Sequence, residues 1–457
     1  MTSTPKQLFF SIAAILMSFT TTLAATSATK SIKVGNATWT YTIKPVTSND
    51  GSTTQVASLK SVVGAKGDIT IPATVTIDGT EYGVQGIDVE VTKIEGGVFM
   101  SATDITSVTI SEGITSIGGS AFYNCTSIKS ISLPSSLKTI ASNAFQLCSG
   151  LTSVVIPEGV TSIGGSAFYL CSNLQSVSLP STLQTIGSNA FQQDKKLQSV
   201  TIASPSQLTD IGDYAFEQCD ALTSFTIPAS VTRIGQSAFQ WCFALESLTI
   251  EQGDGSAKMT IEQGAFRQCE ALESITIPGR VSTIQDEAFR YCYGATSITI
   301  SDGVTSIGAN SFSQSKITEI YIPGSVKTIG EYAFENSHEL SNVTLGDGVE
   351  TVGQNAFKSH ANNLTLTCEG TTTIPTIDAS SFNDYGAVEV SVPTGYEHLY
   401  TEDNGWSGKV KVTTTLSQPV YDNQPTTYYD LQGRPVGSHP TQPGLYISSL
   451  RLTLHNK

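Results

Sequence analysis

A short apolar motif repeats along most of the chain. In one copy, the segment from Leu151 to Ile156 has apolar residues at its first, fourth and sixth positions, with Thr and Ser among the others. This pattern is typical of a short strand with one buried face. Pro157 then ends the strand, because proline lacks the amide donor that a sheet needs.

The rest of each copy predicts a bend and a turn. A second short apolar pair is closed by a glycine, as at Ile163 and Gly164. An Ala-Phe pair follows, and the Ser or Asn before it, such as Asn189 or Ser237, is a common first residue of a helix. We therefore expect each copy to be one coil made of a strand, a bend and one turn of helix.

The phenylalanine of the Ala-Phe pair marks the period of the repeat. Eight of the twelve intervals between successive members are 23 residues, and the others are 22, 25, 25 and 27. Such a period predicts a solenoid, with loop insertions at residues 204–207 and 251–257. The thirteen members are Phe99, Phe122, Phe145, Phe168, Phe191, Phe216, Phe239, Phe266, Phe289, Phe312, Phe334, Phe357 and Phe382.

A single coil is too small to fold alone. Burial of about seven apolar side chains contributes about 10 to 20 kcal/mol, whereas ordering the backbone of one coil costs about 20 to 45 kcal/mol. Stacked coils share backbone hydrogen bonds and cover both faces of each Phe layer. At about 4.8 Å per strand, the stack is roughly 60 Å long.

The unit L-x-x-I-x-I-P-x-x-V-x-x-I-G-x-x-A-F-x-x-C resembles the BspA-like leucine-rich repeat family of bacterial surface proteins. It recurs about a dozen times between residues 97 and 393. The resemblance implies an α/β repeat solenoid, a right-handed coil of about 12–13 turns with short parallel strands and one-turn helices. It also implies attachment to host proteins or other cells.

The residues before the solenoid predict a signal peptide and a cap. Residues 1–24 combine one basic residue, Lys6, with an apolar stretch and a small-residue cleavage site, which is typical of a secretory signal peptide. We therefore expect a secreted protein, or one on the outer surface of a bacterium. Residues 25–96 contain strand-like runs without the repeat, and we expect a β-rich cap because a solenoid needs its first coil covered.

The residues after the repeats predict three further parts. A closing segment completes the solenoid of residues 97–411, and residues 412–427 form a linker rich in Thr, Gln, Pro and Asn. Residues 428–457 include Tyr428 to Val436 and are similar to the C-terminal sorting segments of bacteria that use type IX secretion. The segment is shorter than a full sorting domain.

Composition narrows the classes of partner. The net charge is −15 and charged residues make up only 14% of the chain, so the exposed strand positions are mostly Ser and Thr. An acidic chain without a basic stripe disfavours nucleic acid and anionic membrane surfaces as partners. We expect a monomer without a membrane span in the mature chain.

The cysteines predict neither disulfides nor a metal site. Equivalent residues of stacked coils have parallel Cβ vectors, which is a poor geometry for a disulfide. We expect a ladder of buried thiols, since free Cys packs as a small hydrophobe. The five histidines lie beyond the ladder and no C-x-x-C pair occurs, so we expect no metal and no cofactor. Seven cysteines lie three residues after a repeat Phe, namely Cys125, Cys148, Cys171, Cys219, Cys242, Cys269 and Cys292.

The sequence favours a binding protein over an enzyme. It contains no G-x-S-x-G, no H-E-x-x-H and no phosphate-binding glycine loop. One alternative is a secreted carbohydrate- or peptide-acting enzyme that uses carboxylates such as Glu262, Glu270, Glu273 and Glu287. A structural surface-coat protein is another. Ice binding is a third, because the Ser and Thr ladders are regular, although charged residues interrupt them.

One cluster of turns carries candidate partner-binding residues, which we call the aromatic ridge. Exposed aromatic rings flanked by arginine are typical of binding hot spots for a protein or glycan on host or neighbouring cells. A second interpretation is that these rings seal the edge of the core. The ridge comprises Trp241, Phe243, Arg267, Arg290, Tyr291 and Tyr293.

Overall fold

The computed structural model describes residues 28–34, 36–48, 50–77, 87–359, 363–378, 380–382, 387–406 and 410–416, with the short segments 428–429, 435–437 and 447–448. The signal peptide predicted at residues 1–24 lies outside them. The chain divides into two compact units, Met1–Thr415 and Leu416–Lys457.

The first unit begins with a β-rich cap. β2 (Ala37–Thr47) pairs antiparallel with β1 (Ala28–Val34) and β3 (Thr53–Val63), while β6 (Ile87–Ile94) pairs parallel with β3 and antiparallel with β5 (Thr74–Ile77). The ring of Trp39 is buried and meets that of Phe99 edge-on, with 6.1 Å between centroids. The cap therefore covers the first layer of the solenoid, as terminal segments of repeat proteins do.

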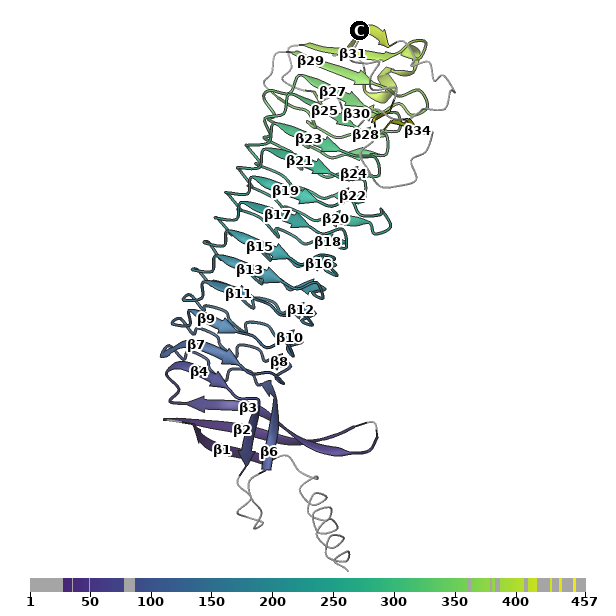
Figure 1. Cartoon of the computed structure of the whole chain (residues 1–457). Coiled ribbons are helices and arrows are strands. Elements are labelled where there is room, and N and C mark those ends of the chain that lie inside the picture. The colour runs from purple at the N-terminus through teal and green to yellow at the C-terminus, as the bar shows by residue number, and fades with distance from the viewer. Residues whose placement is uncertain are drawn as a thin grey trace, which may run out of the picture. The chain divides into compact units, whose positions relative to one another are not determined.

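Two rows of parallel strands form the solenoid, and Figure 1 shows them side by side along the stack. Equivalent residues are in register, for example Ser176 with Ser199 in the first row and Ile140 with Ile163 in the second. The first row comprises β4 (Gly67–Ile71), β7 (Ile105–Ile110), β9 (Ser130–Ser132), β11 (Ser153–Val155), β13 (Ser176–Leu179), β15 (Ser199–Ile202), β17 (Ser224–Ile227), β19 (Ser247–Ile250), β21 (Ser274–Ile277), β23 (Ser297–Ile300), β25 (Glu319–Ile322), β27 (Asn342–Leu345), β29 (Asn363–Cys368), β31 (Ala387–Pro393) and β32 (Val410–Leu416). The second row comprises β8 (Ser116–Ile117), β10 (Thr139–Ile140), β12 (Ser162–Ile163), β14 (Thr185–Ile186), β16 (Asp210–Ile211), β18 (Arg233–Ile234), β20 (Met259–Ile261), β22 (Val281–Ile284), β24 (Ser306–Ile307), β26 (Thr328–Ile329), β28 (Thr351–Val352) and β30 (Thr376–Ile377).

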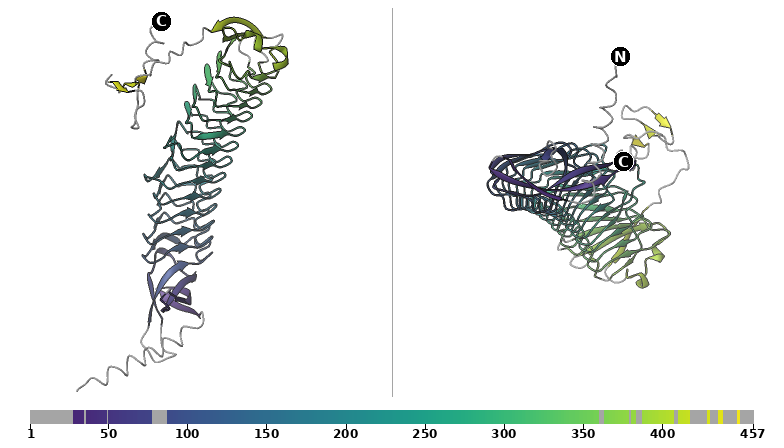
Figure 2. Two further views of the ribbon diagram at one scale, coloured as in Figure 1. Left: turned by 90° about the vertical axis from the view of Figure 1, so that its right-hand side faces the viewer. Right: turned by 90° about the horizontal axis from the view of Figure 1, so that it is seen from below.

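The second row is a continuous ladder, whereas the first row is interrupted. Pairing in the second row runs from β6 through β8 to β30. In the first row it stops between β9 and β11, between β15 and β17, between β19 and β21, and between β23 and β25. The second row therefore keeps the coils aligned at the points where first-row pairing stops. Figure 2 shows the coils stacked into an elongated, gently curved body.

The one-turn helices expected at the Ala-Phe pairs are wrong, because these segments are hydrogen-bonded turns. Two residues in the left-handed region bracket the pairs from Phe122 to Phe334, as Ser166 (φ 55°) and Leu170 (φ 60°) bracket Phe168, and such residues do not continue a right-handed helix. The N–H of Phe168 donates to the carbonyl of Ala190 in the next coil (2.8 Å) rather than within its own turn. The helices assigned among the described residues are two short 3₁₀ helices, η1 (Glu397–Leu399) and η2 (Glu402–Asn404).

The thirteen repeat phenylalanines form one stacked column through the solenoid. Successive ring centroids lie 4.8 to 5.5 Å apart, and the ring planes are within 14° of each other. The rings from Phe122 to Phe357 are at most 1% exposed. The spacing of the Phe residues in the sequence therefore corresponds to one buried ring in each coil of the solenoid.

A ladder of thiols runs beside the column, which confirms the expectation for the cysteines. All eight are free and buried, and the Cys148 thiol donates to the carbonyl of Phe122 (3.1 Å), as Cys171 does to Phe145 (3.2 Å). Burial raises the pKa of the Cys125 thiol to about 11. These groups therefore pack as neutral thiols.

A closing segment covers the last coils of the solenoid. The ring of Tyr400 meets that of Trp406 edge-on at 5.2 Å, and the Trp406 indole donates to the carbonyl of Pro375 (2.8 Å). β32 extends over the first residues of the linker expected at 412–427.

The second unit contains one small sheet. In it, β33 (Tyr428–Tyr429) pairs antiparallel with β34 (Pro435–Gly437) and with β35 (Ile447–Ser448). The rest of the sorting segment expected at residues 428–457 lies outside the described residues.

Candidate functional site

The aromatic ridge is built from equivalent positions of successive turns. Trp241, Gln268 and Tyr291 each lie two residues after a repeat Phe, and each is in the left-handed region, with φ between 60° and 66°. The turns are joined by backbone bonds, since the N–H of Trp241 donates to the carbonyl of Arg267 (3.0 Å) and that of Gln268 to Arg290 (2.8 Å). This geometry places the three side chains in a row along the edge where the first-row strands begin.

Two arginines and a glutamate hold Tyr291 in place. Glu287 accepts from both Arg267 (2.9 Å) and Arg290 (2.7 Å), and both guanidinium groups lie over the Tyr291 ring, at 5.5 and 4.6 Å from its centroid. Planar guanidinium groups stack well on aromatic faces. The arginines are thereby fixed in one arrangement, and one of their two charges is neutralised by Glu287.

The remaining ridge side chains project their rings outward. Phe243 is 41% exposed and Tyr293 is 40% exposed, while Trp241 and Tyr291 are half-buried. Tyr293 lies 5.9 Å from Tyr291, with an angle of 40° between the rings. Partial burial, followed by the neighbouring Tyr291 and Glu270, raises the pKa of the Tyr293 hydroxyl.

The structure brings most of the predicted ridge together. Arg267, Arg290, Tyr291 and Tyr293 form one contact cluster, and Trp241 joins the row because its indole donates to Gln268 Oε1 (2.6 Å). Phe243 belongs to the same row of turns because it lies two residues after Trp241 in the sequence.

Sequence reasoning missed two residues of the ridge. Gln268 occupies the turn position of Trp241 and Tyr291 in the coil between them, so the period could have found it. Glu287 lies two residues before Phe289, and only the stacking of coils brings its carboxylate to Arg267 of the preceding coil.

The carboxylates named for an enzyme do not converge. Glu287 belongs to the ridge, and Glu262 is bonded to Arg233 (2.8 Å), which also pairs with Asp210 (3.1 Å) and Asp213. Glu270 and Glu273 are exposed. Carboxylates that neutralise arginine are poorly placed as paired general acids and bases.

Two further observations concern metal binding and membrane-spanning helices. Within the described ranges, no group of three or more His, Cys, Asp or Glu side chains is arranged to hold a metal ion. In the same part of the chain, the structure contains no helix of the length and apolarity needed to cross a bilayer.

The stacked parallel coils, with a buried aromatic column and a hydroxyl-rich strand row, define a leucine-rich-repeat solenoid. The chain belongs to the BspA-type leucine-rich repeat family, whose model matches residues 92–205, 202–256 and 259–389 with six copies. No curated protein matches the chain.

Several solved structures are similar to this chain. A leucine-rich cell surface protein from Faecalibacterium prausnitzii A2-165 is 28% identical, with 76% of this chain and 96% of that chain covered and a TM-score of 0.44. A leucine-rich repeat protein from Bacteroides ovatus ATCC 8483 is 22% identical, with coverages of 84% and 99% and a TM-score of 0.43. The pneumococcal vaccine antigen PcpA is 18% identical, with coverages of 85% and 100% and a TM-score of 0.42.

Proposed function

We propose that this is a secreted or surface-exposed, non-enzymatic binding protein of a bacterium. Its solenoid attaches to a protein or glycan on host macromolecules or neighbouring cells. The signal peptide predicted at residues 1–24 and membership of the BspA-type family support export. The proposal on binding rests on the aromatic ridge, where exposed rings are held on a rigid repeat scaffold.

The ridge has the properties that binding hot spots share. Aromatic rings dominate such sites because they bury much area at a small cost in side-chain entropy, and arginine adds directed hydrogen bonds and stacks on the rings. The Glu287 bridge and the stacked guanidinium groups fix Tyr291 before any partner arrives. Preorganised contacts lose less entropy on binding.

The ridge places its rings at a left-handed turn position that most coils share. Other coils place Asn124, Leu147 or Gln193 at this left-handed turn position, whereas the ridge places Trp241 and Tyr291 there. A bulky residue in this region costs about 1 to 2 kcal/mol. Because Leu147 and Leu170 adopt the same backbone in uniform coils, this cost is common to the turns, and the ridge differs only in the aromatic side chains that it places there.

The test is binding by the full chain to an array of host extracellular proteins and glycans. Trp241→Ala combined with Tyr291→Ala should weaken capture tenfold or more, since hot spots contribute about 2 kcal/mol or more. The matched control is Tyr123→Ala with Tyr169→Ala, which removes two half-buried rings from uniform turns. Full binding by a folded ridge variant would remove the ridge from consideration, and failure of the wild type on every surface would favour a structural coat.

A further inference from the structure

In two regular coils, one hydroxyl closes the corner that follows the first-row strand by bonding to the backbone of the preceding coil, and the coils that alternate with them have Gly113 and Gly159 at that position. The Thr182 hydroxyl accepts from the N–H of Gly159 (2.8 Å) and donates to the carbonyl of Val160 (3.0 Å). Ser136 makes the same two bonds to the coil before it (2.9 Å each). The closing hydroxyl therefore binds one main-chain donor and one main-chain acceptor.

Ser230 occupies the same corner position but lacks these bonds. It lies nine residues before its repeat Phe, as Thr182 does, yet its Oγ is buried without a hydrogen-bond partner in the described part of the chain. The residue equivalent to Gly159 is Gln207, at the end of the insertion, and its N–H donates to the carbonyl of Ser181 instead (2.9 Å). The insertion has thus taken the main-chain donor away from this corner.

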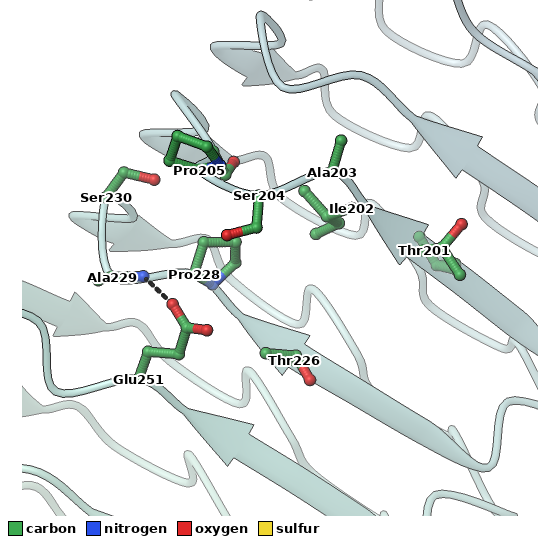
Figure 3. Close-up of a pocket in the computed structure, with 12 residues that line it drawn as sticks. Thr201, Ile202, Ala203, Ser204, Pro205, Thr226, Pro228, Ala229, Ser230 and Glu251 are labelled. Carbon is green, nitrogen blue, oxygen red and sulfur yellow. Dashed lines mark hydrogen bonds between the residues drawn. The ribbon is translucent and has the colours of Figure 1, made fainter.

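A cavity of about 440 Å³ opens at the same corner. It lies where first-row pairing stops between β15 and β17, and its lining includes Ile202, Ser204, Pro228, Ser230 and Glu251. Figure 3 shows the hydroxyls of Ser204 and Ser230 pointing into the space between the loop of the insertion and the segment 228–229. The unsatisfied Ser230 hydroxyl therefore lies covered at the wall of the cavity, beside two strand edges that do not pair with each other.

We propose that this cavity binds the main chain of an extended peptide with small side chains. A peptide group supplies the N–H donor and the carbonyl acceptor that the closing hydroxyl binds in regular coils and that Ser230 lacks. Strand edges that are not hydrogen-bonded to the adjacent strand are a usual place for an added extended peptide, whose main-chain bonds supply the affinity. The bound peptide group therefore makes the hydrogen bonds that the backbone of the preceding coil makes to the hydroxyls of Ser136 and Thr182.

The lining also selects the side chains of the peptide. Pro205, Pro228, Ala203 and Ala229 leave room for small apolar groups but offer no deep pocket for a ring. None of the lining residues is cationic, and Glu251 is acidic, with one oxygen accepting from the N–H of Ala229 (2.9 Å). The Arg280 guanidinium lies behind this wall and donates to the carbonyls of Pro228 and Glu251, so the lining selects by size rather than by charge.

This site is separate from the aromatic ridge. The ridge occupies the turns before the first-row strands, whereas the cavity occupies the corner after them. A strand of four residues, about 13 Å long, lies between the two positions in each coil. The peptide site therefore neither needs the ridge nor competes with it.

The test uses the full chain and a library of acetylated, amidated hexapeptides built from Gly, Ala, Ser, Pro and Lys, with retained peptides identified by affinity selection and mass spectrometry. Wild type should retain a subset. Ser204→Trp, which places a ring in the cavity, should weaken binding of that subset at least tenfold. Ser230→Ala, a conservative change, should weaken it about fivefold.

The control is Ser136→Ala, which removes a hydroxyl from a closed corner and should leave peptide binding unchanged. Thermal unfolding of each variant shows that the fold is kept. The proposal is overturned if the wild type retains no hexapeptide. It is also overturned if Ser204→Trp and Ser230→Ala both bind the retained peptides as tightly as wild type.

Discussion

The coils between Phe122 and Phe191 differ from those between Phe216 and Phe289 in their corners and in the side chains of their turns, but not in their core. In the first group every interval is 23 residues and the corners at Ser136 and Thr182 are closed. The second group follows one insertion, contains another, and carries the cavity and the aromatic ridge. Yet ring centroids lie 5.1 Å apart across the second group and 5.2 Å apart in the first.

This difference shows how the solenoid can vary without losing its fold. The Phe column and the second strand row run through both groups without a break, so they carry the alignment of the coils. Corners and turns face outward and can therefore change length and chemistry. We propose that the uniform coils are scaffold and that partner recognition, as proposed above for the aromatic ridge and the cavity, belongs to the irregular coils.

The strongest test of a uniform core is removal of one ring from each group. Phe168→Ala and Phe266→Ala should each lower the free energy of unfolding by about 3 to 5 kcal/mol, because both rings are fully buried between stacked neighbours. Denaturant unfolding measures both losses. The two losses should agree within about 1 kcal/mol, and a much smaller loss at Phe266 would show that the irregular coils have a looser core.

A second test concerns the buried Arg280, which has no counterpart in the uniform coils. Its guanidinium is 1% exposed and donates to the carbonyls of Val231 (2.6 Å), Pro228 (3.1 Å) and Glu251. Arg280→Met should lower the free energy of unfolding by about 3 kcal/mol, since the change leaves three acceptors without their donor.

The matched control for Arg280 is Lys138→Met in the uniform coils. Lys138 is exposed, so its loss should change stability by less than about 0.5 kcal/mol. If the two substitutions change the free energy of unfolding equally, Arg280 does not stabilise the packing of the coils on either side of the longer insertion.

A third test uses the one break in the thiol ladder, Asp194. Its carboxyl is fully buried without a hydrogen-bond partner among the described residues, and burial raises its pKa well above the usual range. The folded chain therefore holds this proton more tightly than the unfolded chain. The associated stability is present in full below the unfolded pKa of about 4 and is lost as pH rises toward the folded pKa, at about 1.4 kcal/mol per pH unit.

Asp194→Cys restores the residue of the neighbouring coils and should remove this loss. Unfolding of wild type and variant, compared at each pH from about 4 to 7, isolates the contribution of this group from that of other carboxylates. The advantage of the variant should grow as pH rises, and Asp194→Asn should show the same trend. If the difference in unfolding free energy between variant and wild type stays constant with pH, Asp194 is not protonated in the folded chain.

The smallest expected effect is on the stability of the ridge. Phe243→Ala combined with Tyr293→Ala should change the free energy of unfolding by less than about 1 kcal/mol, because exposed rings contribute little to folding. Thermal unfolding checks this. A loss near that of Phe266→Ala would support the other interpretation of the ridge, in which its rings seal the core.

The period alone was enough to predict the core but not the turns. The spacing of the Phe residues implies the column, and the fixed offset of the cysteines implies the thiol ladder. The turns were wrongly predicted because residues such as Trp241 and Leu170 rarely adopt a left-handed backbone by themselves. Stacking imposes that conformation, since each turn bonds to the next coil rather than within itself.

The site could be predicted only in part for the same reason. Adjacent positions in the sequence showed that aromatic rings and arginines share a few turns. The bridge from Glu287 to Arg267 joins neighbouring coils, so only the structure shows it. Likewise, the interval of 25 residues was enough to predict the shorter insertion. It could not predict that Ser230 lacks a hydrogen-bond partner, because that depends on the direction of the Gln207 N–H in the folded chain.

The most direct measurement of the central claim compares partner capture by two double variants of the full chain. Phe243→Ala with Tyr293→Ala alters the irregular coils, and Tyr123→Ala with Tyr169→Ala alters the uniform ones. Against an array of host extracellular proteins and glycans, the first should lose capture tenfold or more, and the second should match wild type. Equal capture by both variants, or an equal loss in both, would contradict a scaffold whose recognition lies in its irregular coils.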